Sequence, residues 1–281
     1  MTTAHEPHDT TFEPFAQHEF YRQINKELVD RALDTADSEQ PGRESRVVDV
    51  ACGTGAISKL VVDYWRRHHR QGELLGLDPS ESALQRARRA VQSKFARFVQ
   101  GTAEGLSSLA SAADVVLFCN AIHLVEDKEM VVEQVHGVLT TKGVFAFNTS
   151  FYNGAYAEGT DRFYRKWMVR ALQIIRRDQP DLRTDRAAKS TAMRWLSADE
   201  YRDLLAREGF VVLHAEERRA DLPLESWTDI SGYTDFAEGA LPGIPLSLSV
   251  PALKQAVREV FEEMKLTSIP RNWFQVVAQR A

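Results

Sequence analysis

Short apolar segments alternate with longer amphipathic stretches through the first half of the chain. The apolar segments are rich in β-branched residues and are bounded by polar or glycine-containing turns, which predicts buried strands. A regular alternation of strands and helices predicts a parallel sheet that is covered by helices. The predicted strands lie at residues 46–50, 73–78, 96–100, 113–119 and 144–148, and the predicted helices at residues 56–70, 86–90 and 127–139.

The N-terminal region is predicted to form one helix before the first strand. Residues 1–14 read as a loose arm, and a helical pattern occupies residues 15–35. Pro41-Gly42 is expected to end this helix. The apolar residues that recur at near-helical spacing are Phe20, Ile24, Leu28 and Leu33.

Two closely spaced glycines follow the first predicted strand. This strand carries Asp49 near its end, and Gly53 and Gly55 then precede a helical stretch. Glycine lets the backbone approach a ligand where a Cβ would collide, and the start of a helix offers N–H groups that lack a partner within the helix. The arrangement is typical of a loop that binds a nucleoside cofactor, although such turns also occur without a ligand.

A second acid stands one strand–helix–strand unit later. The predicted second strand ends at Asp78, and Ser80 or Ser82 is expected to cap the helix that follows. In doubly wound folds, a carboxylate at this position binds the ribose hydroxyls of a nucleoside. The dinucleotide pattern Gly-x-Gly-x-x-Gly is not met, because residue 58 is Ser58, so the use of nicotinamide or flavin is disfavoured.

These motifs resemble those of the class I S-adenosylmethionine (SAM) methyltransferases. Ala51 stands where that family often has its first glycine, and Thr102 stands where it often has an aspartate that binds adenine. The resemblance implies SAM as the cofactor and S-adenosylhomocysteine (SAH) as its product. It also implies a set of cofactor-binding residues, which are Asp49, Ala51, Gly53, Gly55, Asp78, Pro79, Thr102, Ala103, Asn120 and Ala121.

The resemblance extends to the architecture. The order of elements in the family predicts a sixth strand at residues 211–213 and the last strand at residues 273–278. The expected fold is α/β, with a doubly wound, mostly parallel, seven-stranded Rossmann-like sheet and a helical cap insertion. The expected parts are an N-terminal arm and helix that cover the cofactor site (1–43), a SAM-binding core (44–150), a helical cap or substrate insert (151–194), and the rest of the core (195–281) with a second cap segment at about 222–266.

The two cap segments are rich in aromatic residues. In the first, Phe163, Trp167, Ala171 and Ile174 recur at the spacing of one helix face. The aromatic side chains either only pack a cap onto the sheet or line an apolar chamber that suits a flat or aliphatic small molecule. The expected substrate-binding residues are Tyr21, Phe151, Tyr152, Tyr164 and Trp167.

Charge is unevenly distributed along the chain. The net charge is −5, yet residues 160–194 contain ten bases and four acids. These bases either form a solvated helix face or attract an anionic substrate, including one that is tethered to an acidic carrier protein. The negative charge of the whole chain argues against unspecific binding of nucleic acid.

Composition and cysteine usage restrict the class of protein further. A chain of 281 residues with 43% apolar content can bury one large core, or a core with an inserted subdomain. No apolar run approaches the roughly 20 residues that span a bilayer, and the N-terminus lacks a signal-peptide core, so we expect a cytoplasmic monomer or homodimer without a membrane partner. Cys52 and Cys119 are expected to be packing residues, and no metal site is expected, because no histidine has metal-ligand spacing.

Methyl transfer mainly requires alignment of donor and acceptor and the exclusion of water. If a hydroxyl acceptor must lose a proton, His123 is the leading candidate base, because imidazole accepts protons near neutral pH and the fourth strand of the family ends beside the reacting methyl group. Alternatively, His123 packs against the cofactor or caps a helix. His18 and Tyr21 are weaker candidates on the N-terminal helix.

Three functions remain open from the sequence. The first is O-, N- or C-methylation of a small organic molecule, for example in secondary metabolism. The second is methylation of protein or RNA, which is disfavoured by the net charge and because residues 120–123 read Asn-Ala-Ile-His rather than Asn-Pro-Pro-Tyr. The third is a protein of this fold that binds SAM without transferring its methyl group, as in cyclases or decarboxylases.

Overall fold

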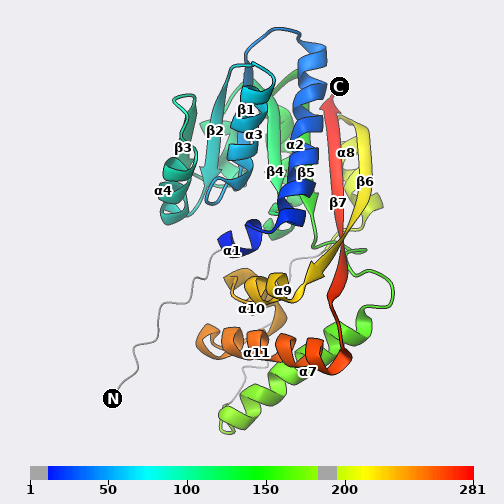
Figure 1. Ribbon diagram of the computed structural model, residues 1–281. Coiled ribbons are helices and arrows are strands. Elements are labelled where there is room, and N and C mark those ends of the chain that lie inside the picture. The colour runs from blue at the N-terminus through cyan, green and yellow to red at the C-terminus, as the bar shows by residue number, and fades with distance from the viewer. Residues whose placement is uncertain (1–11, 183–194) are drawn as a thin grey trace. The chain divides into compact units, whose positions relative to one another are not determined.

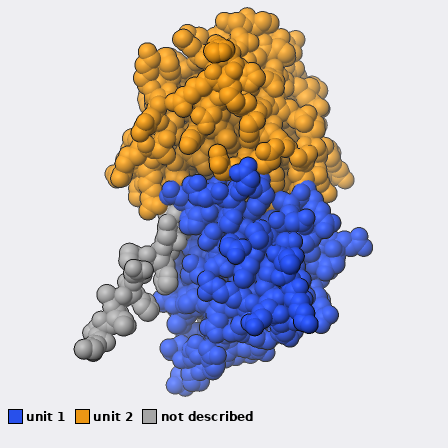
Figure 2. Space-filling model, viewed as in Figure 1, with its two compact units in different colours: residues 1–21, 156–193, 219–271 blue, residues 22–155, 194–218, 272–281 orange. Residues whose placement is uncertain are grey.

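The computed structural model describes residues 12–182 and 195–281 and divides the chain into two compact units. We call residues 22–155, 194–218 and 272–281 the sheet unit, and residues 1–21, 156–193 and 219–271 the helical unit (Figure 2). The helical unit thus combines the N-terminal segment with the two long connections in which the sequence predicts cap segments.

The sheet has seven strands in the order β3-β2-β1-β4-β5-β7-β6 (Figure 1). Strands β1 to β5 pair in parallel, and β7 is antiparallel to β5. The predicted doubly wound, mostly parallel sheet is therefore confirmed. The strands are β1 (Ser45–Val50), β2 (Gly72–Asp78), β3 (Ala96–Gln100), β4 (Ala113–Cys119), β5 (Leu139–Thr149), β6 (Phe210–Pro223) and β7 (Ser268–Arg280).

Helices cover both faces of the sheet, because its central strands are apolar on both sides. Within β1, Val47 packs with α2 (Glu19–Glu39), α3 (Ala56–Arg67) and α4 (Glu81–Ala90). Its neighbour Val48 points to the opposite face. That face is covered by η1 (Ala103–Gly105), α5 (Leu106–Leu109), α6 (Lys128–Val138) and α8 (Ala198–Arg207). Two apolar layers thus enclose the sheet.

The helix ends follow local sequence signals. Ser80 caps α4 by accepting the N–H of Ala83, which decides between the two predicted caps. Ser197 and Glu200 form a capping box at the start of α8. The break predicted at Pro41-Gly42 follows the end of α2, and Gly42 has the left-handed φ of 80° that glycine tolerates.

Some predicted bounds are wrong. The single helix expected at residues 15–35 is divided into α1 (Glu13–Ala16) and α2, and neither glycine nor proline marks the break between them. The sixth strand was expected at residues 211–213, but β6 continues to Pro223. Its second half is charged, as is common for a strand at the edge of a sheet, and therefore lacks the apolar pattern on which the prediction depends.

The helical unit is built around α7. The predicted face of this helix is confirmed, because Phe163, Trp167, Ala171 and Ile174 are all buried. The aromatic rings of Phe163 and Trp167 contact Trp227 with centroids 5.5 and 5.6 Å apart. The helices of this unit are α1, α7 (Asp161–Asp178), α9 (Leu224–Ile230), α10 (Thr234–Ala240) and α11 (Leu246–Met264). Within residues 12–182 and 195–281, every helix is too short or too polar to traverse a lipid bilayer.

Candidate functional site

The backbone of the glycine turn after β1 adopts left-handed φ values that favour glycine. Ala51, Gly53 and Gly55 have φ values of 54°, 53° and 89°, all in the left-handed region. A Cβ on Gly55 would also lie 2.9 Å from Cγ2 of Val91. Gly55 is the N-cap of α3 and has no side chain that could cap this helix, whereas the backbone N–H of Ser58 in its first turn donates to Asp49.

Asp78 holds this turn from the end of β2. Its Oδ2 accepts the N–H of Gly53 at 2.8 Å, and its Oδ1 accepts the N–H of Ser80 at 2.9 Å. The side chain is buried, with 8% of the residue exposed. A carboxylate has about four acceptor positions, so two remain for the hydroxyl groups of a ligand. Asp78 and Gly53, which belong to separate motifs in the sequence, are therefore joined by a hydrogen bond.

Asp49 lies beneath the turn and is almost completely buried. Its Oδ2 accepts the hydroxyl of Ser58 at 2.6 Å, whereas Oδ1 is buried and has no hydrogen-bond partner within the described residues. Burial raises the pKa of this carboxyl to about 7, the charge of Asp78 adds to the rise, and the bonds from Ser58 oppose it. A buried acceptor without a partner is a feature that a cationic or N–H-bearing ligand would satisfy.

The loop after β3 joins the same edge of the sheet. Gln100 pairs with Asp78 across the parallel strands, and the N–H of Gly101 donates to the carbonyl of Asp78 at 3.1 Å. Thr102 is exposed, and the buried Ala103 begins η1. Pro79 directly follows β2 and is exposed at this edge as well.

The end of β4 completes the edge. Asp49 pairs with Leu117 and Cys119 pairs with Asn148, so Asn120 follows β4 beside the glycine turn. Asn120 has a left-handed φ of 55° and is followed by Ala121 and the short helix η2 (Ile122–Leu124). All ten predicted cofactor residues therefore lie at or just after the carboxyl ends of β1 to β4, where ligands bind in open α/β sheets.

His123 is held in a defined orientation on η2. Its Nδ1 lies 3.1 Å from Oγ1 of Thr149, and its ring stacks on Phe151 at a centroid distance of 4.3 Å. Thr149 Oγ1 also accepts the N–H of Phe151 at 3.0 Å. The structure thus brings together the predicted base and one predicted substrate residue, and the sequence did not point to Thr149.

The other predicted substrate residues have packing partners within their own units. Tyr152 of the sheet unit is fully buried and donates to Glu217 Oε1 at 2.9 Å. In the helical unit, Trp167 is fully buried and donates to the carbonyl of Leu253 at 2.9 Å. Tyr164 accepts a bond from Arg271 at 3.2 Å, and Tyr21 is buried against Phe12 and Phe15. The weaker base candidate His18 contacts Asp229 at 2.8 Å in this unit.

Part of the basic excess near α7 is balanced within the helical unit. Arg170 pairs with Glu259 at 2.6 Å and with Glu263 at 3.0 Å, and Lys166 also pairs with Glu263. Four of the ten predicted bases lie outside the described residues, as does one of the acids. These residues are Arg183, Arg186, Lys189, Arg194 and Asp185.

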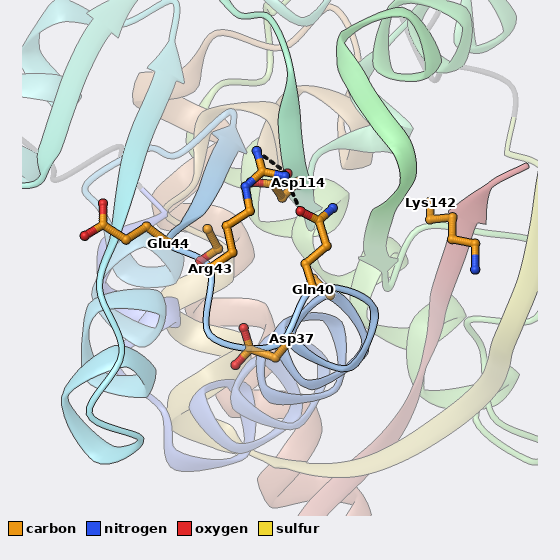
Figure 3. Close-up of a pocket in the computed structure, with 8 residues that line it drawn as sticks. Asp37, Gln40, Arg43, Glu44, Asp114 and Lys142 are labelled. Atoms are coloured by element: carbon orange, nitrogen blue, oxygen red, sulfur yellow. Dashed lines mark hydrogen bonds and ion pairs between the residues drawn. The ribbon is translucent and has the colours of Figure 1, made fainter.

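A cavity at the opposite edge of the sheet is too small for a cofactor. This cavity of about 10 Å³, close to the space of one water molecule, lies near the starts of β1 and β4. Figure 3 shows Arg43 pointing toward Asp114 and Gln40 there, and Arg43 lies 3.7 Å from the Asp114 carboxylate. Asp114 also accepts the N–H of Arg46 at 2.9 Å, so this edge is closed by polar contacts between strand ends.

Within residues 12–182 and 195–281, His, Cys, Asp and Glu side chains do not form groups of three or more that could hold a metal ion. Cys52 and Cys119 are buried free thiols, and burial raises the pKa of both. These thiols therefore act as packing residues within the sheet unit.

A family model described as a methyltransferase domain matches residues 42–191, more than half of the chain. The chain belongs to the class I SAM-dependent methyltransferase family. The family implies SAM as the cofactor. The site of this methyltransferase fits that cofactor, because an adenosyl group needs the close approach that Gly53 and Gly55 permit, and because the orphaned Oδ1 of Asp49 can accept from an ammonium group.

Solved structures show the same fold. A Bacillus halodurans protein assigned as a methyltransferase is 14% identical with a TM-score of 0.56 and covers 90% of this chain and 98% of its own. A protein from Galdieria sulphuraria, assigned as a sarcosine dimethylglycine methyltransferase, is 15% identical with a TM-score of 0.55 and covers 96% of this chain and 91% of its own. The [4+2]-cyclase SpnF is 17% identical with a TM-score of 0.50 and covers 89% of this chain and 81% of its own. No curated protein sequence matches the chain.

Proposed function

We propose that this methyltransferase transfers the methyl group of SAM to a hydroxyl of a small organic molecule, with His123 as the base. The observation that carries the proposal is the His123–Thr149 pair at the carboxyl edge of the sheet. The aromatic residues Phe151 and Trp195, whose rings lie 5.8 Å apart beside His123, supply an apolar wall for the acceptor.

Each residue of the site has a distinct task in this proposal. When bound, SAM supplies an electrophilic methyl group on a sulfonium. Asp78 binds the ribose hydroxyls with its two remaining acceptor positions, and Asp49 accepts from the ammonium group through Oδ1. The turn at Gly53 and Gly55 lets the cofactor lie close to the protein backbone, because neither residue has a Cβ that would occupy the space.

His123 removes the proton of the acceptor hydroxyl through Nε2. For Nε2 to accept a proton, Nδ1 must carry the hydrogen and donate it to Thr149 Oγ1. This oxygen has two lone pairs, so it can accept both His123 and the N–H of Phe151. The acceptor oxygen would then form a C–O bond to the methyl group that SAM supplies, and the electron pair of the broken S–C bond would leave with sulfur as SAH. In this proposal Thr149 holds His123 in the tautomer that can act as a base.

The alternative is a function without methyl transfer. It is favoured by the similarity in fold to the [4+2]-cyclase SpnF. Under this alternative His123 only packs against the bound molecules, and its removal changes affinity rather than turnover of the cofactor.

Incubation with methyl-labelled SAM and fractionated cell extract tests the proposal. We expect label in the small organic fraction and a stoichiometric amount of SAH. Label in the precipitated protein or RNA fraction would instead identify a macromolecular acceptor. Binding of SAM without formation of SAH in any fraction would favour the alternative function.

A further inference from the structure

A buried network of amide side chains connects α2 to the end of β4 within the sheet unit. Asn25 of α2 is fully buried, and its Oδ1 accepts Nδ2 of Asn120 at 3.2 Å and Nδ2 of Asn148 at 3.0 Å. From β7, Trp273 Nε1 donates to Oδ1 of Asn120 at 2.9 Å. Both ends of the Asn120 amide are therefore held, one by α2 and the other by β7.

The network holds the backbone of Asn120 in an energetically unfavourable conformation. Asn120 has a φ of 55°, in the left-handed region. This conformation is unfavourable for most residues other than glycine, although single asparagines adopt it. Its N–H donates to the carbonyl of Asn148 at 2.9 Å and lies 3.0 Å from Oδ1 of the same residue. Because Ala121 and His123 follow directly, the turn at Asn120 sets where these residues lie at the edge of the sheet.

We propose that Asn25 is a positioning residue of this methyltransferase. Together with Trp273 it holds Asn120 in the left-handed turn that presents the end of β4 to the cofactor. The inference rests on the proposed function only in that SAM occupies this edge, and it is independent of the acceptor. It assigns to the N-terminal helix a part in cofactor binding that acts through Asn120 rather than through direct contact.

Three variants separate positioning from ordinary packing. Asn25→Ala removes the acceptor of Asn120 Nδ2, and Trp273→Phe removes the donor to Asn120 Oδ1. Gln275→Leu is the matched control, because Gln275 Nε2 donates to the carbonyl of Ile24 at 2.9 Å. This buried bond fastens the same part of α2 from the same strand without touching Asn120.

Calorimetric titration with SAH and thermal melting are then compared for the wild type, the three variants and the double variant of Asn25→Ala with Trp273→Phe. We expect Asn25→Ala and Trp273→Phe each to weaken SAH binding by about 3- to 10-fold, the effect of one lost hydrogen bond. Both variants release the side chain of Asn120. The loss of SAH affinity in the double variant should therefore be smaller than the product of the fold-losses in the two single variants. Gln275→Leu should lower the melting temperature and bind SAH within about 2-fold of the wild type.

Two results would overturn the inference while leaving the proposed function intact. One is wild-type affinity for SAH in both Asn25→Ala and Trp273→Phe. The other is an equal loss of affinity in Gln275→Leu, which would show that the docking of α2, and not the turn at Asn120, is what matters. If the wild-type protein binds neither SAM nor SAH, both the inference and the proposed function are wrong.

Discussion

Asp78 accepts the backbone N–H of Gly53 at 2.8 Å, so the end of the second strand holds the glycine turn that follows the first. We propose two roles for this carboxylate in the methyltransferase. It shapes the turn that admits the cofactor, and its remaining acceptor positions face the edge where the ribose is expected.

Asp78→Ala is expected to weaken SAH binding by about 1.5 to 3 kcal/mol, because hydrogen bonds to a charged group are lost. The variant should also lower the melting temperature, since Gly53 and Ser80 lose their acceptor. Calorimetry and thermal melting measure the two effects. Ser80→Ala is the control, because it removes the cap of α4 and leaves the carboxylate in place. Equal SAH affinity in the wild type and Asp78→Ala would refute the role in ribose binding.

Ala51→Gly is expected to stabilise the protein by about 1 kcal/mol. Ala51 has a φ of 54°, a conformation that costs a residue with a Cβ about 1 to 2 kcal/mol and that glycine adopts freely. The higher flexibility of glycine in the unfolded chain offsets part of this gain. Urea unfolding measures the change. Ala83→Gly within α4 is the control and should destabilise, so a decrease in both variants would contradict the strain at Ala51.

Cofactor affinity is expected to rise as the pH increases from 6 to 8. Burial raises the pKa of Asp49 to about 7, and only the ionised form can pair with an ammonium group. The stability of the free protein depends on the ionisation of Asp49 in the opposite direction. The folded state holds this proton more tightly than the unfolded state, so the contribution of Asp49 to stability is present at low pH and is lost as the pH rises toward 7.

Titrations with SAH at several pH values test this linkage. In the wild type the dissociation constant should fall as the pH rises, and binding should release protons in the lower half of the range. In Asp49→Asn both effects should disappear, because the amide does not titrate. A flat pH profile in the wild type would mean that Asp49 does not meet the ammonium group.

His123→Asn is expected to lower kcat by about 10²- to 10⁴-fold, the usual contribution of a general base, with little change in the affinity for SAH. Thr149→Val removes the hydrogen-bond partner of Nδ1 and should lower kcat by a smaller factor, whereas Thr149→Ser keeps the oxygen and should retain most of the activity. Turnover of the acceptor identified with labelled SAM is the measurement. Unchanged kcat in His123→Asn would leave His123 with a packing role only.

The parts of this protein that depend on local pattern could be predicted from its sequence. The bounds of β3 and β4 agree with the prediction, because both are apolar runs between clear turns. The acids and glycines of the cofactor edge could be identified because each motif is contiguous and the two are one structural unit apart. The family comparison and the sheet order confirm that interpretation of the fold.

The parts that depend on long-range contacts could not be predicted. Asn25 is 95 positions from Asn120, and Trp273 is 153 positions from it, so no local pattern connects them. Similarly, aromatic residues at helical spacing predict a buried face but do not show what buries it. Trp167 and Tyr152 are both fully buried in the units to which they belong, and a role in substrate binding stays a prediction for them.

Calorimetric titration of the wild-type protein with SAH at pH 8 tests the central claim most directly. The claim is that the glycine turn, Asp49 and Asp78 form the binding site for an adenosyl cofactor. We expect saturable binding of about one SAH per chain, with clear weakening in Asp78→Ala. The absence of any saturable heat with either SAH or SAM, from a folded protein, would contradict the account.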